Sequence, residues 1–338
     1  MEYILNETPL KTTNGFRINN IKTDLNIPEK IDFHEYEISS EDIKVTTSIE
    51  DGFSSKIGLD HDKYKKTILD IDKVINDLIF IKYEFKNNES LIDNIVINIE
   101  ENSEASIVLK YISMDDTYSF HNGRLEINSK PNSKLNITII NELNRDSENL
   151  YAGTIHASNE SVVTTNLIDL NGKKRIYNFE STTEKNAISN LNNIYIGKDN
   201  DLIDMNYRYV NNKEYSTNNI EVQGLLKDES IKHFKGTIDF IKGSSNSVGK
   251  ENENCILLSD TCRSKSLPML LCGEENVEGA HSVSSGSIDK NKLFYLMSHG
   301  IDETEAKNII IKSNFNVIIN NIPGSVKEEI SEIIDNYI

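Results

Sequence analysis

The chain has 338 residues, with 54 Asp and Glu against 36 Lys and Arg, and its formal net charge is −18. This charge argues against a nucleic-acid or anionic-membrane partner, because Lys and Arg drive binding to phosphate groups. No apolar run approaches the ~18–20 residues of a membrane span, and the N-terminus lacks the basic and apolar regions of a signal peptide. Three cysteines do not make a disulfide framework, so we expect a reduced, cytoplasmic chain.

The first part of the chain follows no single pattern. Residues 1–90 mix short apolar runs with charged stretches such as residues 61–66. This mixture predicts an α/β lead-in. We separate it from a β-helix core over residues 91–286 and a C-terminal helical region over residues 287–338.

Between about residues 90 and 260, apolar and polar side chains alternate. A period of two places successive side chains on opposite faces of a strand. No helical stripe here is long enough to compete, so the sequence predicts an all-β segment. The clearest apolar rows are Ile95, Ile97 and Ile99; Leu135, Ile137 and Ile139; Ile203, Met205, Tyr207 and Tyr209; and Phe234, Gly236, Ile238 and Phe240.

The strands also recur at a nearly regular interval. Asn makes up roughly one residue in eight and suits turns, because it tolerates positive φ. The first four turns are roughly 27–30 residues apart, which predicts a β-solenoid, in which each turn buries its apolar row against the next. A β-sandwich is the alternative, which the scarcity of Asn-Gly hairpin dipeptides disfavours. The turns, each followed by a small residue and an alternating run, begin at residues 102, 132, 159, 185 and 228.

The last fifty residues are typical of helices. Ser287 or Asp289 can cap a first helix over the Leu-Phe-Tyr-Leu segment 293–296. Gly300 ends this helix at a position that favours left-handed geometry.

Two more helices follow. Residues 302–305, Asp-Glu-Thr-Glu, form a capping-box pattern that opens a helix to about residue 319. Residues 323–324, Pro-Gly, interrupt the chain. A further capping-box pattern at residues 325–328 opens a last amphipathic helix. We expect this small helical unit to dock on the end of the solenoid or on a partner.

Few residues carry a recognisable chemical motif. There is no phosphate-binding loop, dinucleotide fingerprint, His-Glu-x-x-His or Gly-x-Ser-x-Gly pattern. Cys255, Cys262 and Cys272 are too widely spaced for a Cys-x-x-Cys metal knuckle, and Cys255 stands in an apolar run that is typical of a core. Cys262 is flanked by Arg263 and Lys265, a setting that favours the thiolate.

His281 is the second candidate. It lies between Gly279-Ala280 and Ser282, small residues that leave an imidazole room to approach a metal or a partner. A structural role is the commoner one for a single histidine. The remaining histidines form no cluster in the sequence: His34, His61, His121, His156, His233 and His299.

Several short motifs then follow one another. They are Phe-Lys-Gly-Thr-Ile at 234–238, Leu-Leu-Ser-Asp at 257–260, Pro268, Gly-Ala-His at 279–281, and Leu-Phe-Tyr-Leu-Met-Ser-His-Gly-Ile-Asp-Glu-Thr-Glu-Ala at 293–306. In this order they resemble the SufB/SufD family of iron–sulfur cluster assembly proteins, over roughly residues 230–338. The resemblance implies a mainly β protein, a right-handed parallel β-helix flanked by helices, which agrees with the periodicity.

The resemblance also implies site residues. Cys262 falls where SufB-type members place the cysteine thought to receive sulfur and ligate the nascent cluster. His281 falls where the family places an interface histidine that also ligates it, and both side chains suit iron. The residues that fall where the family docks the SufC ATPase, an ABC-type protein, are Leu293, Phe294, Tyr295, Leu296 and Gly300.

Partners follow from the same resemblance. It implies a dimer with a SufB/SufD paralogue or with a second copy, a cysteine desulfurase system as the sulfur source, and a transient iron–sulfur cluster as cargo. It also allows a flavin. Ser282 stands where SufB-type members usually have Glu, and the chain is short for either type, so it combines SufB-like and SufD-like character.

The leading hypothesis is therefore a non-catalytic scaffold. Two β-helices associate, Cys262 and His281 approach one another near the interface, and the ATPase opens the assembly. The rival is an enzyme, a β-helix polysaccharide lyase or hydrolase that uses a pair of carboxylates as acid and base. A purely structural solenoid is the third alternative.

Overall fold

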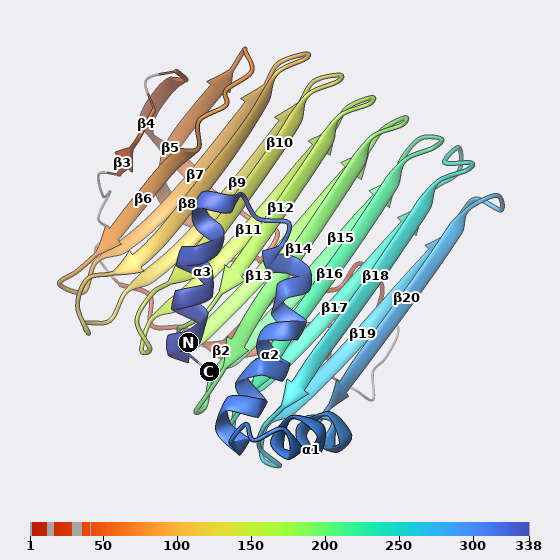
Figure 1. Ribbon diagram of the computed structural model, residues 1–338. Coiled ribbons are helices and arrows are strands. Elements are labelled where there is room, and N and C mark those ends of the chain that lie inside the picture. The colour runs from red at the N-terminus through yellow and green to blue at the C-terminus, as the bar shows by residue number, and fades with distance from the viewer. Residues whose placement is uncertain (1, 12–16, 29–35, 41, 338) are drawn as a thin grey trace.

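The computed structural model of the protein describes residues 2–11, 17–28, 36–40 and 42–337, and it is built mainly from two facing nine-stranded sheets (Figure 1). In spatial order, sheet 1 contains β20 (Glu278–Gly286), β18 (Val248–Leu257), β16 (Thr217–Leu226), β14 (Ile188–Gly197), β12 (Val162–Asp169), β10 (Lys134–Glu142), β8 (Glu104–Ser113), β6 (Ile79–Phe85) and β3 (Glu37–Ile38). Sheet 2 contains β19 (Arg263–Cys272), β17 (Ile231–Phe240), β15 (Leu202–Asn211), β13 (Lys174–Thr183), β11 (Glu148–Ala157), β9 (Phe120–Ser129), β7 (Ser90–Ile99), β5 (His61–Ile71) and β4 (Lys44–Phe53).

Consecutive strands alternate between the two sheets, so each turn of the chain adds one strand to each sheet. From β5 and β6 onward, every neighbouring pair within a sheet is parallel and in continuous register. This arrangement is a parallel β-solenoid, and the fold class expected from the period-two rows is confirmed.

The turns explain why the sequence stacks in this way. Asn102, Asn132 and Asn186 have φ near +60°, a left-handed conformation that Asn adopts more readily than most residues. Each backbone N–H donates to a carbonyl in the next turn, as Asn102 does to Pro131 at 3.2 Å. The small residue that follows, such as Ser133, is buried. Polar turns are therefore hydrogen-bonded to one another along the solenoid axis.

The interior between the sheets is filled by the inward-facing rows. Its aromatic rings follow one another from turn to turn, with centroids 4.2–6.2 Å apart, in the order Tyr83, Tyr111, His121, Tyr151, Phe179, Tyr207 and Phe234. Each buried large apolar side chain contributes about 1.5–3 kcal/mol relative to an exposed one. The interior rows therefore supply much of the stability of a chain whose surface is strongly acidic.

Each sheet carries a second layer on its outer face. Two helices, α2 (Glu303–Ile319) and α3 (Gly324–Tyr337), lie across sheet 1 (Figure 1). They pack their apolar residues, such as Phe315 and Ile330, against strand residues such as Ile194. A hairpin of β1 (Glu2–Leu5) and β2 (Ile21–Asp24) packs on sheet 2.

The helix caps at the C-terminal end follow the sequence closely. Asp289 caps α1 (Lys290–Ser298) by accepting hydrogen bonds from two backbone N–H groups, and Asp302 caps α2 in the same way through the N–H of Glu305. Gly300 has φ +88°. α3 begins at Gly324, directly after Pro323, one residue earlier than the capping-box pattern at 325–328 predicted.

The N-terminal region differs from the expected α/β lead-in over residues 1–90. In the described part of that region all regular elements are strands, and parallel stacking already begins at β5. Two polar residues of the segment 61–66 contact the neighbouring strand β4. Lys66 pairs with Glu50 at 3.3 Å, and the Tyr64 hydroxyl donates to the same carboxylate. Charged residues therefore occupy a strand that the sequence did not reveal.

The interior near the C-terminal end contains a group of buried charged residues. Lys232 on β17 pairs with Glu253 on β18, both fully buried, and the hydroxyl of Ser266 donates to Glu253 at 2.6 Å. Glu251, two residues earlier on β18, is 2% exposed and neither carboxyl oxygen has a hydrogen-bond partner among the described residues. A Cβ at position 236 would collide with this carboxyl, so Gly236 provides its space.

Burial, with a smaller contribution from the Glu253 charge, raises the pKa of Glu251 from 4.5 to about 8. The folded state then holds a proton that the unfolded chain releases, so this residue lowers stability as the pH rises from about 4.5 to about 8. We expect Glu251→Gln to be more stable than wild type by a margin that grows by about 1.4 kcal/mol per pH unit across that window. Chemical denaturation at a series of pH values measures the margin.

Glu229→Gln provides the control, because Glu229 is exposed in the turn before β17. Its stability relative to wild type should not change with pH. A constant margin for Glu251→Gln over the same range would contradict the protonated state assigned to this carboxyl.

Candidate functional site

The candidate site lies at the C-terminal end of the solenoid, where β19 and β20 are the edge strands of their sheets. Internal turns are covered by a turn on each side, whereas these two strands have a strand neighbour on one side only. β20 is consequently exposed along nearly its whole length, and β19 is mostly half-buried. Such an edge presents unpaired backbone groups that can bind another chain.

Cys262 directly precedes β19. It is 5% exposed, and its thiol donates to the carbonyl oxygen of Ser259 at 3.0 Å. The guanidinium of Arg263 donates to the backbone carbonyls of Asp260 and Cys262, both at 3.1 Å. The guanidinium of Arg263 therefore binds backbone carbonyls, and the Cys262 thiol is buried against the turn that contains Ser259.

His281 lies exposed on β20 and pairs in register with Glu251 on β18. Register partners on neighbouring parallel strands point to the same face, so His281 faces the solenoid interior from its open end. It stands directly beyond the partnerless carboxyl of Glu251. The open end thus exposes an imidazole above a buried acid.

Cys262 and His281 are not adjacent within one chain. β19 and β20 run in opposite directions, and the hydroxyls of Ser264 and Ser285 contact at 2.9 Å, which aligns His281 with Pro268. Cys262 lies six strand positions from Pro268, a distance of roughly 20 Å at about 3.3 Å per residue. An iron–sulfur cluster is too small to be bound by both Cys262 and His281 of the same chain across this distance.

The other two thiols occupy different surroundings. Cys272 ends β19 and is exposed, whereas Cys255 on β18 is buried beside the Lys232–Glu253 pair. Burial raises the pKa of the Cys255 thiol to about 11, so it is protonated at neutral pH. The expectation that Cys255 is a core residue is confirmed.

Of the remaining histidines, His233 lies on β17 and His299 caps the end of α1, whereas His34 falls outside the described residues. His121 is fully buried and contacts Asp93 and Asn149 at 2.9 and 2.8 Å. Within the described ranges, no group of three or more His, Cys, Asp and Glu side chains is arranged to hold a metal ion.

The buried polar row of Lys232, Glu251 and Glu253 is the feature that the sequence interpretation missed. Its signal was present in β18, where Glu251, Glu253 and Cys255 occupy the alternate positions that apolar residues fill in earlier strands. Charged residues at inward-facing register positions are costly unless they are paired or neutralised. The row therefore places charged residues in the interior directly next to the open end of the solenoid.

A separate surface is formed by α1. None of its residues is buried; Phe294 and Tyr295 are 74% and 62% exposed. Leu293 and Leu296 are half-buried and pack toward the helices on sheet 1. Between α1 and α2 lies a groove of about 500 Å³ whose lining includes Tyr295 and Leu296. Of the residues expected to bind a partner, Phe294 and Tyr295 thus form an exposed aromatic surface, and Leu293 and Leu296 attach α1 to the helices on sheet 1.

Comparisons with known proteins place this architecture. A family model described as the SUF system FeS cluster assembly, SufBD core domain, matches residues 82–314. No helix within the described residues combines the length and apolar character needed to cross a membrane.

Relatives show the same likeness. The chain is 27% identical over 257 residues to an iron–sulfur cluster assembly SufBD family protein of Archaeoglobus fulgidus, covering 75% of this chain and 68% of that protein. It is 29% identical over 116 residues to the iron–sulfur cluster assembly protein SufD of Bacillus subtilis, covering 34% and 26%. It is 21% identical over 216 residues to SufD of Escherichia coli, covering 64% and 51%. Because the family model matches more than half of its length, the chain belongs to the SufBD family of the SUF system for iron–sulfur cluster assembly.

Proposed function

We propose that this protein is a non-catalytic scaffold that assembles or transfers a nascent iron–sulfur cluster at an interface between two β-solenoids. Family membership supports this role over the polysaccharide lyase and the purely structural alternatives. The observation that carries the mechanism is the open end of the solenoid, where two edge strands and His281 are exposed.

The separation of Cys262 and His281 favours a site shared by two chains. One chain leaves roughly 20 Å between the two residues along the strands, whereas two open ends that face one another can bring Cys262 of one close to His281 of the other. Edge strands also offer backbone hydrogen bonds to the second chain. The partner is a SufB/SufD paralogue or a second copy, and the cluster is the cargo, with sulfur from a cysteine desulfurase system.

A SufC-type ABC ATPase is the proposed partner of α1. Tyr295 lines the α1–α2 groove, and Phe294 is exposed on the same helix. Helix α1 lies beside β19 and β20 at the open end of the solenoid (Figure 1). Exposed aromatic residues beside an apolar groove are typical anchors of protein interfaces. Nucleotide-driven motion of the ATPase would then act directly on the edge strands. That the protein is cytoplasmic and that it binds a flavin are predictions from the sequence and its family resemblance.

Anaerobic reconstitution with iron and sulfide tests the assigned ligands. We expect Cys262→Ser and His281→Ala each to lower the iron bound at fixed iron concentration by about tenfold or more, since even second-layer partners of metal ligands are worth about 10–100-fold. Visible absorption and iron and sulfide analysis measure the loss.

The other thiols are matched controls in the same experiment. Cys272→Ser should bind as much iron as wild type. If Cys255→Ser loses the cluster while Cys262→Ser retains it, the buried polar row rather than the Cys262 turn holds the sulfur ligand. Full uptake by both Cys262→Ser and His281→Ala would remove the proposed site.

The docking surface has its own test. Replacing both Phe294 and Tyr295 by Ala should weaken binding of the SufC-type ATPase by at least about 30-fold, because truncation of an aromatic hot spot costs about 2 kcal/mol or more. Surface plasmon resonance measures the affinity, and circular dichroism confirms that the β region is intact.

Ile49→Ala is the control for this test. Ile49 is 51% exposed on β4, at the opposite end of the solenoid, so its truncation should leave ATPase binding unchanged. Equal binding by the double variant and the control would show that the ATPase docks elsewhere.

A further inference from the structure

A cleft of about 960 Å³ lies where the N-terminal hairpin meets the outer face of sheet 2. One side is formed by Arg17 and by β2 with Lys22. The other side is formed by β17 and β19, which contribute His233, Arg263 and Lys265. Segments more than 200 residues apart in sequence therefore converge on one concave surface.

The cleft is basic in a strongly acidic protein. Five of its side chains are Arg, Lys or His, and none of the described residues that line it is Asp or Glu. Within the described part of the chain, Arg17, Lys22 and Arg263 form no ion pair with a carboxylate. Behind His233 lies the buried carboxylate of Asp204, 3.4 Å from Nδ1 of His233. This carboxylate is also bound by Lys235 at 2.6 Å.

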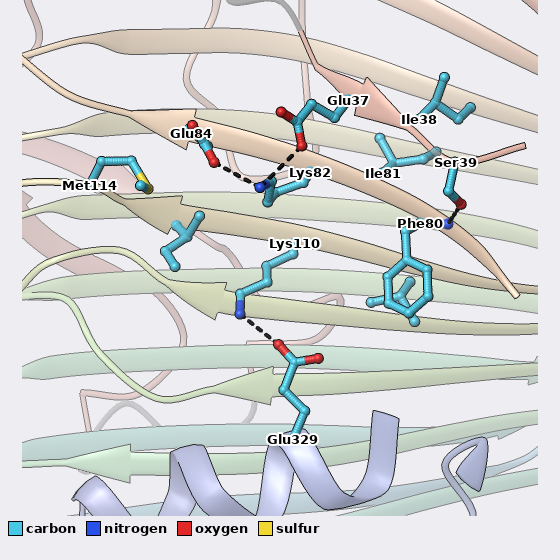
Figure 2. Close-up of a pocket in the computed structure, with 12 residues that line it drawn as sticks. Glu37, Ile38, Ser39, Phe80, Ile81, Lys82, Glu84, Lys110, Met114 and Glu329 are labelled. Carbon is cyan, nitrogen blue, oxygen red and sulfur yellow. Dashed lines mark hydrogen bonds and ion pairs between the residues drawn. The ribbon is translucent and has the colours of Figure 1, made fainter. Parts of the chain in front are cut away.

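The lysines of a second cleft differ from Lys22 of the basic cleft in that they form ion pairs with carboxylates of the protein. This cleft, of about 560 Å³, lies on the outer face of sheet 1 near α3 (Figure 2). Lys82 there pairs with Glu37 and Glu84 at 3.1 and 2.8 Å, and Lys110 pairs with Glu329 at 2.9 Å. Each ammonium in Figure 2 is neutralised by the protein itself, which is not so for Lys22 or Arg17 in the basic cleft.

The strand register fixes the cations at one end of the sheet. Arg263 pairs in register with Ile231, and Lys265 pairs with His233, at the start of neighbouring parallel strands. The guanidinium of Arg263 is also held by two backbone carbonyls at 3.1 Å. The positive charges on this side are therefore presented by a rigid sheet, which reduces the entropy lost on binding an anion.

Three apolar side chains line the cleft: Ile21, Leu202 and Ile231, of which Ile231 is 37% exposed. Apolar lining with a few convergent polar groups is typical of sites for organic ligands of drug size, and the volume falls within their range of about 300–1,000 Å³. Arg and Lys together suit phosphate oxygens, Arg through paired N–H groups and Lys as a point charge.

We propose that this cleft binds a small organic molecule with two or more phosphate groups. The phosphates contact Lys22, Arg17 and Arg263, and the organic part packs on Ile231 and its neighbours. The cleft shares edge strand β19 with the open end of the solenoid, but its lining includes neither Cys262 nor His281, and the proposal does not depend on the role proposed for them.

Binding of ADP, as its fluorescent mant derivative, and of inorganic pyrophosphate to the purified chain tests the proposal. We expect saturable binding of both at one site per chain. The double substitution Lys22→Ala and Arg263→Ala should weaken both by about tenfold or more, because it removes charge-assisted hydrogen bonds to phosphate. Ile231→Ser should weaken mant-ADP and leave pyrophosphate binding unchanged.

Lys250→Ala is the matched control, because Lys250 is an exposed lysine on β18 of the other sheet. Its affinities should equal those of wild type. If the double variant does not fold, the single Lys22→Glu variant, altered at an exposed position of β2, is expected to show the same loss. Absence of saturable binding at millimolar ligand, or equal affinities for wild type and the Lys22 and Arg263 variants, would overturn the proposal. Loss of pyrophosphate binding in Ile231→Ser would overturn the division between phosphate and organic parts.

Discussion

The structure depends on one constraint: in a parallel solenoid, the strands of each turn are hydrogen-bonded by the strands of the turns before and after it. Internal turns satisfy this automatically, but the two terminal turns do not. At the N-terminal end, the antiparallel strands β3 and β4 cover β6 and β5. At the C-terminal end, β19 and β20 have no such cover within the described residues. The two ends of the same fold therefore have different capacities for binding.

Buried polar groups interrupt the apolar interior at several levels of the solenoid. Most of the interior holds isoleucines, leucines and aromatic rings, but His121 contacts Asp93, and Arg175 pairs with Asp169 and Asp201. Near β18, the Lys232–Glu253 pair and the protonated Glu251 form a further polar group. Pairing and proton uptake are the two means by which a buried charge becomes tolerable. The uncovered end is therefore one of several levels at which the interior holds paired or neutralised charges.

Much of this fold could be predicted from the sequence because its rules are local. Period-two rows, left-handed Asn turns and the caps at Asp289 and Asp302 each involve a few consecutive residues. The strands before residue 90 were not recognised, since their charges are satisfied across strands by residues such as Glu50.

The candidate site was less accessible to such reasoning. Cys262 and His281 are close in sequence, but β19, which follows Cys262, and β20, which carries His281, run in opposite directions. The hydroxyl contact of Ser264 with Ser285 aligns these strands so that the two residues lie far apart. The pairing of His281 with Glu251 and the meeting of Lys22 with Arg263 depend on how distant segments stack. No local pattern carries that information.

The hydrogen-bonded turns have a consequence for how such proteins can change in length. Because each turn repeats the same left-handed corner and donates to the next one, a whole turn can be gained or lost without altering the corners that remain. Insertion of a single residue within a strand would instead exchange interior and surface positions over the rest of that strand. We therefore expect such proteins to change in length during evolution by whole turns, which leaves the structures of the covered end and of the open end unchanged.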